Sequence, residues 1–440
     1  MPRPFVSDCE GFHRRDFLKI GVGGLFGLTL PQLLRLEAQA APQERRQRRA
    51  NAVIMLWLGG GPSHQDIWDL KPDAPEGIRS LFKPIPTKAD GMQICEHLPK
   101  TAQAADKITI VRSLYHSIPS HGPASVFMTT GNKPTPALDY PSMGSLTAKL
   151  LTTEKGIPPY VSFGDLRGDR GGIAGYLGTA YNPFIVENGG GRGNAFRVRG
   201  IQLPGGFTLD ELEKRDKLFR RFDATFRSLE KSADLVEGLD TFHQQALEIL
   251  RSDKTKKAFA LEQEPPAVRE RYGPTPFGQG ALAARRLVEA GVRFVTISLG
   301  GWDTHRQNFD VLAKRLLPTL DQTLSALVED LDARGLLETT IVYCAGEFGR
   351  TPKINKTAGR DHWARSMAGV LAGGGIQRGY VHGSTDAQGM APATEPCTPD
   401  DVSATIFHCL GIDPHMELMT STGRPIQLFR EGRVIDKLLA

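Results

Sequence analysis

The sequence predicts an α/β fold with a doubly wound, mostly parallel sheet and right-handed crossovers. Continuous apolar runs of strand length recur along the chain, and from residue 280 onward they alternate with amphipathic stretches of helical length. Such runs are typical of strands that helices bury on both faces. Because sites in these sheets lie beyond the carboxyl ends of the strands, polar residues that border the apolar runs are the first candidates for chemistry.

In the first half of the chain, the sequence predicts three strands, a glycine-rich extended segment and a helical insertion. Strands are expected at residues 51–58, which run into a Gly-Gly-Gly-Pro loop, and at 108–111 and 160–163. Residues 164–203 are rich in glycine and predict an extended excursion. Residues 208–262 are charged, carry alanine and leucine at helical spacing and contain a single glycine, so they predict a helical insertion.

The second half predicts a regular alternation of helices and strands. A helix is expected at 280–290, a strand at 292–299 and a long amphipathic helix at 312–334, which ends at Gly335, a typical C-terminal residue of helices. The remaining expected elements are strands at 340–344 and 368–371 and a helix at 400–410. This alternation favours parallel pairing.

The first 40 residues indicate export. Arg14 and Arg15 lie between His13 and an Asp-Phe-Leu-Lys sequence, and a glycine-rich apolar run and an Ala-Gln-Ala cleavage site follow. The run has about 15 residues, fewer than the about 20 that a membrane-spanning helix needs. We therefore expect residues 1–40 to be a twin-arginine signal peptide, recognised by the twin-arginine export machinery. The mature protein is then periplasmic or secreted, without a stable membrane anchor.

The composition favours a soluble globular protein, with one large domain expected at residues 51–440. The formal net charge is +5, and four arginines lie in the run 44–49. No aromatic residue interleaves this run, so residues 41–50 predict a basic leader and the chain predicts no nucleic-acid partner. The sequence has no CxxC pair and therefore does not support a cysteine zinc site or a redox motif. Cys397 and Cys409 are close enough in sequence for a disulfide in an oxidising compartment.

Three polar clusters border the expected strands of the second half. Asp303 and His305 follow one strand, Glu347 follows the next, and His362 precedes the apolar stretch at 368–371. Carboxylate and imidazole groups on converging strand ends predict a site for a divalent metal: zinc, or manganese or calcium if oxygen ligands dominate. His64 and Asp66, in the loop after the first strand, are further candidate metal ligands.

Each of these residues also has a structural interpretation. Asp303 could cap a helix, and His305 and His362 could be loop histidines with satisfied hydrogen bonds. Glu347 could pair with Arg350. The roles of His64 and Asp66 are equally open between metal binding and loop stabilisation.

The clusters resemble the alkaline phosphatase/sulfatase superfamily, most closely an exported, largely uncharacterised bacterial branch often called sulfatases. The resemblance spans residues 53–414. Residues 327–335, the following strand and the turn at Glu347 resemble its helix–strand–metal-turn unit. His362 resembles the metal-binding histidine that the superfamily has late in its sequence. Asp303 and His305 resemble its pair of an aspartate and a histidine. The resemblance implies an alkaline-phosphatase-like sheet and one or two bound cations.

The chain departs from this superfamily at several positions. Phe348 stands where the turn normally has a second ligand, and Gly59 and Gly60 stand where the first strand normally ends in aspartate. Counting back from Thr130-Gly131 places His121 at the position of the modified cysteine of sulfatases, so formylglycine chemistry is not supported.

The catalytic residues that we expect lie next to these departures. Ser120 could act as an alkoxide nucleophile, and His121 as a metal ligand or general acid. Arg350 could hold a phosphate or sulfate oxygen.

Two functions follow from these residues. The first is an exported metal-dependent hydrolase of a phosphate or sulfate ester, acting on a small-molecule or glycan substrate. The alternative is a catalytically degenerate binding or scaffold protein on the same fold. Converging ionisable groups cost stability unless something binds between them, and this favours the hydrolase.

Overall fold

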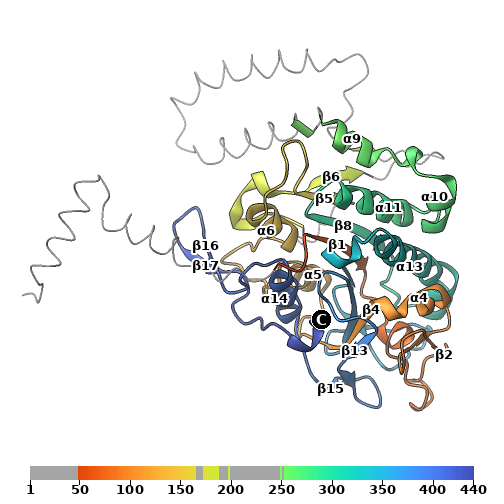
Figure 1. The fold of residues 1–440 in the computed structure, drawn as a ribbon. Helices are drawn as coiled ribbons and strands as arrows, with labels where there is room; N and C mark the ends of the chain where they lie inside the picture. Colours follow the sequence, from red (N-terminus) through yellow and green to blue (C-terminus); the bar gives the residue numbers. More distant parts are fainter. Residues whose placement is uncertain (1–47, 165–171, 188–196, 199–247, 250–251) are drawn as a thin grey trace, which may run out of the picture. The chain divides into compact units, whose positions relative to one another are not determined.

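The computed structural model describes residues 48–164, 172–187, 197–198, 248–249 and 252–440, and these residues build one nine-stranded sheet (Figure 1). The strand order is β13-β4-β12-β9-β1-β8-β5-β6-β7. The strands are β1 (Ala52–Gly59), β4 (Ile108–Leu114), β5 (Tyr160–Phe163), β6 (Phe184–Glu187), β7 (Arg197–Val198), β8 (Phe294–Gly300), β9 (Thr340–Ala345), β12 (Met367–Ala372) and β13 (Tyr380–His382). Only β12 and β7 run opposite to the other strands of this sheet.

Helices cover both faces of the sheet. One face carries α4 (Pro99–Gln103), α9 (Asp253–Phe259), α10 (Pro266–Tyr272), α11 (Pro276–Glu289) and α13 (Leu317–Ala333). The other face carries α5 (His121–Thr130), α6 (Met143–Leu150) and α14 (Pro399–Cys409). The sheet is thus mixed, mostly parallel and doubly wound, which confirms the predicted fold class.

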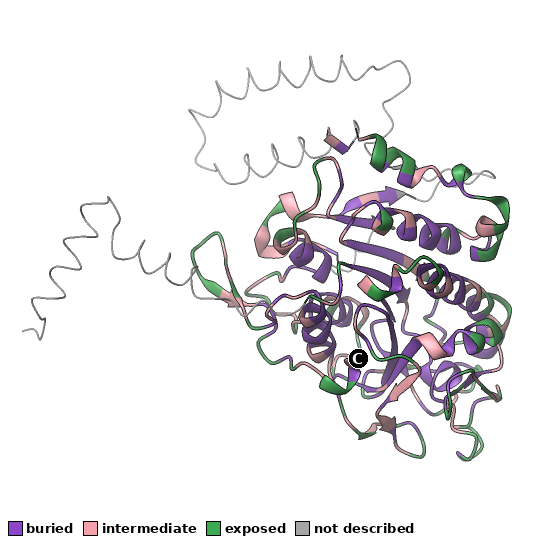
Figure 2. Ribbon diagram, viewed as in Figure 1, coloured by how far each residue is buried: buried purple, intermediate pink, exposed green. Residues whose placement is uncertain are grey.

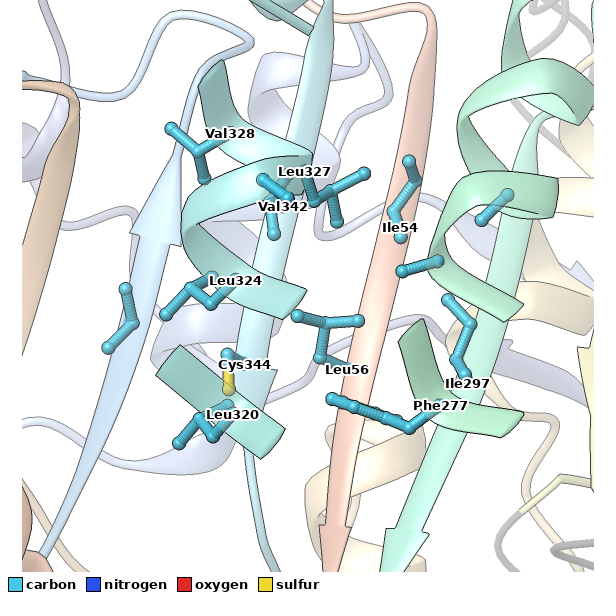
Figure 3. Close-up of a cluster of buried hydrophobic side chains, with 14 of the residues drawn as sticks. Ile54, Leu56, Phe277, Ile297, Leu320, Leu324, Leu327, Val328, Val342 and Cys344 are labelled. Carbon is cyan, nitrogen blue, oxygen red and sulfur yellow. The ribbon is translucent and has the colours of Figure 1, made fainter. Parts of the chain in front are cut away.

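Strand β1 shows why the apolar runs are continuous. Ile54 and Leu56 lie in the apolar layer with α11 and α13, whereas Met55 and Trp57 lie in the layer on the opposite face. Figure 3 shows Ile54 and Leu56 between these helices and the neighbouring strands. Each large apolar side chain buried in this way contributes about 1.5–3 kcal/mol. Figure 2 shows the resulting burial: the strands of the sheet are buried, whereas the helices are exposed on the sides that face away from the sheet.

Most predicted elements of the second half are present within a few residues. The helix predicted at 312–334 begins earlier, as α12 (Asn308–Val311), continues through a π-helix (Leu312–Leu316) and ends with α13. Gly335 has φ 68°, as expected at a helix C-terminus. The reversed direction of β12 was not predicted from the sequence.

Several predictions concern residues outside the described part of the chain. These are the signal peptide at 1–40, residues 41–47 of the basic leader and most of the helical insertion at 208–262. The described end of the leader is bonded to the domain, because Arg49 N donates to Cys409 O and Arg49 Nη1 to Ala440 O. Among the described residues, no helix has the length and hydropathy to cross a membrane.

Cys397 and Cys409, whose spacing in sequence left a disulfide open, are both free and buried. Cys397 precedes α14 and Cys409 is its last residue. Twelve residues at about 1.5 Å each separate them by about 18 Å, whereas a disulfide needs Cα atoms within about 7 Å. Closeness in sequence was misleading because the intervening segment is a helix.

Candidate metal centre

The candidate site lies at the edge of the sheet where the parallel strands end. The loop after β8 carries Asp303 and His305, and the connection after β4 leads to His121, the first residue of α5. His362 lies in the short strand β11 (His362–Trp363), opposite Arg350 of β10 (Gly349–Arg350). Because β12 runs in reverse, its beginning lies at this edge, so a histidine that precedes β12 meets residues that follow β8 and β9.

Three imidazoles and one carboxylate converge there. His305 Nε2 lies 3.0 Å from Asp303 Oδ1 and 3.0 Å from His362 Nε2. His362 Nε2 lies 3.2 Å from Asp303 Oδ1, and His121 Nε2 lies 3.5 Å from Asp303 Oδ2. Ligand atoms of His121, Asp303 and His362 all lie within 4.8 Å of one another. We call His121, Asp303, His305 and His362 the His–Asp group. All four side chains are partly exposed, so the group is open to solvent.

Each imidazole of the group binds an oxygen acceptor through its other nitrogen, Nδ1. The pairs are His121 with Glu347 Oε1 at 2.5 Å, His305 with Asp361 Oδ1 at 2.6 Å and His362 with Pro119 O at 2.9 Å. Carboxylate and carbonyl oxygens only accept, so each Nδ1 carries the proton and each neutral ring keeps its Nε2 lone pair free. Three lone pairs and a carboxylate therefore face one another, with the outer hydrogen bonds that are usual for metal-bound histidines.

The spacing of these atoms fits a cation between them. Four ligands at about 2.0–2.1 Å from a tetrahedral zinc ion lie about 3.3 Å apart. The four contacts that join these residues measure 3.0 to 3.5 Å, and the ligand atoms of His121, Asp303 and His362 lie within 4.8 Å of one another. Without a cation or extra protons, facing lone pairs would repel each other, so the donor set fits a divalent transition metal.

The protonation states of Asp303 and His362 suit this arrangement, whereas the pKa of His121 is shifted towards its charged form, from which a bound cation would displace a proton. Partial burial raises the pKa of Asp303, but the hydrogen bond from Arg350 and the positive charge of its guanidinium outweigh this effect and lower the pKa to about 2. Asp303 is therefore ionised at neutral pH. Burial lowers the pKa of His362, which favours its neutral form. The hydrogen bond to Glu347 raises the pKa of His121.

Glu347 lies behind His121, away from the shared centre. Its carboxylate is buried and accepts from the backbone N–H of Gly60 at 2.9 and 3.1 Å, in addition to its contact with His121. The neighbouring Phe348 ring packs against the rings of His121 and His362, with centroids 4.9 and 4.5 Å away. Phe348 thus contributes an aromatic ring, and no metal ligand, beside these two histidines.

Arg350 is directed at the protein and not at the open side of the site. Its side chain is fully buried. Nε donates to Gly61 O at 2.8 Å, and Nη1 donates to Arg360 O at 3.1 Å. Nη2 donates to Asp303 Oδ1 at 2.5 Å, to Trp302 O at 3.3 Å and to Gly60 O. The guanidinium therefore fixes Asp303 and joins the loops that follow β1 and β8.

His64 and Asp66, in the short helix α3 (His64–Ile67), are buried. His64 Nε2 contacts Ser366 Oγ at 3.0 Å, and burial lowers the pKa of His64 to about 4. Asp66 binds Arg360 through two contacts of 2.8 and 2.9 Å. In the described structure no hydrogen bond or ion pair joins either residue to the His–Asp group.

Ser120 is the exposed N-cap residue of α5, and its side chain makes no capping hydrogen bond. Its neighbours on both sides contact the site, since Pro119 O accepts from His362 and His121 belongs to the His–Asp group. The backbone therefore holds Ser120 beside the site.

Sequence reasoning missed the outer partners of the histidines. Asp361 was expected among the converging ionisable groups but not as the partner of His305, and the carbonyl of Pro119 was not expected at the site. The partner of Asp66 was missed as well, because Arg360 lies almost 300 positions away.

Fold and site together define an α/β protein with a candidate metal centre at the carboxyl edge of its sheet. A family model matches residues 50–439, and the chain belongs to that family, described as "Protein of unknown function (DUF1501)". A search of curated proteins found no match.

Solved structures similar to the chain share little sequence with it. Ps i-CgsB in complex with k-i-k-neocarrahexaose is 11% identical, with coverage of 83% of this chain and 73% of that one and a TM-score of 0.38. The PsFucS1 sulfatase from Pseudoalteromonas sp. is 12% identical, with coverage of 91% and 72% and a TM-score of 0.37. A protein in the alkaline phosphatase superfamily from Vibrio parahaemolyticus is 12% identical, with coverage of 90% and 71% and a TM-score of 0.35.

Proposed function

We propose that this protein is an exported, metal-dependent hydrolase of a phosphate or sulfate ester. The observation that carries the proposal is the convergence of three Nε2 atoms on Asp303, with each imidazole oriented by an acceptor at Nδ1. A structural cluster of histidines has no need for three such outer partners around an open centre.

The His–Asp group would hold the cation. Three imidazole ligands and one carboxylate favour zinc over manganese or calcium, which prefer oxygen. A divalent cation held by these residues would supply Lewis-acid chemistry for the hydrolysis of an ester.

The surrounding residues orient this group. Glu347 and Asp361 keep the protons of His121 and His305 on Nδ1, so that Nε2 stays available. The N–H of Gly60 holds the Glu347 carboxylate in place. Arg350 holds Asp303 ionised and fixed, which is the role that we propose for it in place of direct substrate binding.

Ser120 is our candidate nucleophile. It lies at the exposed N-terminus of α5, next to His121, where a substrate that reaches the open side of the His–Asp group would meet it. A water molecule is the alternative nucleophile. We propose a small-molecule or glycan ester as substrate, in keeping with export through the twin-arginine machinery to the periplasm or beyond.

A second function is favoured by two local features. Gly60 has no side chain that could bind a metal, and the Phe348 ring packs against two histidines of the site. A metal-bearing binding protein without turnover would show both features. Both functions predict bound metal, so a measurement of metal content cannot distinguish them. Catalytic turnover distinguishes them, because only the hydrolase predicts it.

The test begins with elemental analysis of the purified mature protein. We expect zinc in the wild type, its loss in His362→Ala, and unchanged content in His415→Ala, which removes an exposed histidine outside the site. The zinc-loaded protein is then assayed with p-nitrophenyl phosphate and p-nitrophenyl sulfate. Hydrolysis that Ser120→Ala abolishes while zinc content is unchanged supports the proposed nucleophile. A wild type that stays metal-free after zinc is added overturns the proposal.

A further inference from the structure

The oxygen shell around Arg350 has the composition of a cation site. Four backbone carbonyls and the carboxylate of Asp303 surround one buried guanidinium. Carbonyl and carboxylate oxygens are the ligands with which proteins hold hard divalent cations. Here the positively charged guanidinium of Arg350 lies where such a cation would be bound.

Asp303 is shared between this shell and the His–Asp group. Its Oδ1 accepts from Arg350 Nη2 at 2.5 Å and also faces His305 and His362, whereas Oδ2 faces His121. A carboxylate that bridges two metal ions must present an oxygen to each. Because Oδ1 already accepts from the Arg350 guanidinium, a second ion that shared this oxygen would lie beside a fixed positive charge and would be repelled by it.

The first strand offers no ligand for a second ion. Gly60 follows β1 with φ 120°, and a Cβ there would lie 2.4 Å from Asp303 N. No side chain fits at this position, so the loop contributes only its backbone: the N–H to Glu347 and the carbonyl to Arg350. The carboxylate oxygens of Glu347 in turn accept hydrogen bonds from Gly60 N–H and His121 Nδ1.

We infer that the centre holds one metal ion, and that Arg350 is a positioning residue that replaces a second ion and fixes Asp303 for the first. This inference rests on the proposed metal centre. It adds that the site is mononuclear and that the affinity for the metal depends on a residue that does not touch it.

Metal stoichiometry in the wild type is the first test. Metal-free protein is titrated with zinc by calorimetry, and bound zinc is counted by elemental analysis after removal of the excess. One zinc per chain is expected. Two ions per chain at the site overturn the inference but leave the proposed function standing, whereas no bound zinc overturns the proposed function and the inference with it.

Substitution of Arg350 is the second test. We expect Arg350→Met to weaken zinc binding about 10- to 100-fold, because Asp303 loses its partner. Arg350→Lys keeps the charge without the planar fork, so its affinity should be intermediate. The matched control is Arg285→Met, which removes an equally buried, ion-paired arginine contacting Glu264 and Asp330 outside the site. It should lower stability and leave zinc affinity unchanged.

The absorption spectrum of the cobalt-loaded protein separates positioning from a general loss of stability. The spectrum reports the ligand field, so it should change in Arg350→Met and be that of the wild type in Arg285→Met. An unaltered spectrum and affinity in a folded Arg350→Met overturn the positioning role. If Arg350→Met does not fold, the stoichiometry of the wild type and the affinity of Arg350→Lys decide the question.

Discussion

Asp66 and Arg360 form a fully buried, two-contact ion pair, with distances of 2.8 and 2.9 Å, that ties helix α3 to the loop carrying Asp361 and His362. Arg360 also donates to the carbonyls of Thr351 and Ile78. The pair therefore holds the backbone of the site loop from behind, although neither residue contacts the His–Asp group.

Arg360→Met should lower the free energy of unfolding by about 3–5 kcal/mol, because it leaves the carboxylate of Asp66 buried without its partner. Chemical denaturation measures the change. The control is Arg378→Met, which breaks the exposed pair with Glu338 and should cost less than about 1 kcal/mol. Equal losses in the two variants would contradict the importance that we give to the buried pair.

His64 should make stability depend on pH. Burial lowers the pKa of His64 from the ordinary 6.5 to about 4. Between these values the unfolded chain binds a proton that the folded chain does not, so stability falls as the pH drops from 6.5 towards 4, by up to about 3 kcal/mol.

The comparison is between wild type and His64→Gln, whose amide can keep the contact with Ser366. Urea unfolding of the metal-free proteins at pH 7.5 and pH 5 should show a loss that is about 2 kcal/mol smaller in the variant. Parallel losses in the two proteins would show that His64 is not the group that titrates.

Glu347→Leu should weaken zinc binding about 10- to 100-fold without a loss of stoichiometry at saturating zinc. The reason is that Glu347 contacts His121 Nδ1 and not the shared centre. Competition with a zinc-chelating dye measures the affinity, and Glu338→Gln, in an exposed glutamate outside the site, is the control. Complete loss of zinc from a folded Glu347→Leu would instead make Glu347 a direct ligand.

Replacement of Arg14 and Arg15 by lysine should abolish export, because the twin-arginine machinery reads the arginine pair itself. Cell fractionation of the expressed full-length chain measures the outcome. Arg35→Lys, a conservative change outside the pair, should be exported as the wild type is. Unchanged export of the double variant would contradict the proposed route.

The sequence was sufficient for six strands of the sheet and for the edge at which the site forms, whereas the short strands β6, β7 and β13 were not predicted. Residues 51–58, 292–299 and 340–344 read as buried strands because helices cover both faces, and this pattern is local. Asp303 and His305 then followed from the rule that sites lie at strand ends. His362 was harder, because a residue before a parallel strand would lie at the opposite edge. Only the reversal of β12, which depends on pairing with β4 and β9, brings it to the site.

The contacts that sequence reasoning missed are long-range ones. The pairs His121–Glu347 and Asp66–Arg360 join residues 226 and 294 positions apart. No local pattern indicates which of several acidic residues a given histidine or arginine will meet, because that choice depends on the finished packing. The expected role of Arg350 in substrate binding rested on its guanidinium and on its place beside the expected metal turn, whereas its buried side chain donates to backbone carbonyls and to Asp303.

The close approach of Gly60 to the backbone at Asp303 restricts how this centre can change, in evolution or by design. A ligand on the first strand is the obvious route to a larger metal cluster, yet any side chain at this position meets the backbone of the β8 loop. That loop would have to move first, and its movement would displace Asp303. A single substitution at Gly60 therefore cannot enlarge the proposed centre, and the backbone itself would preserve the one-ion arrangement that we infer.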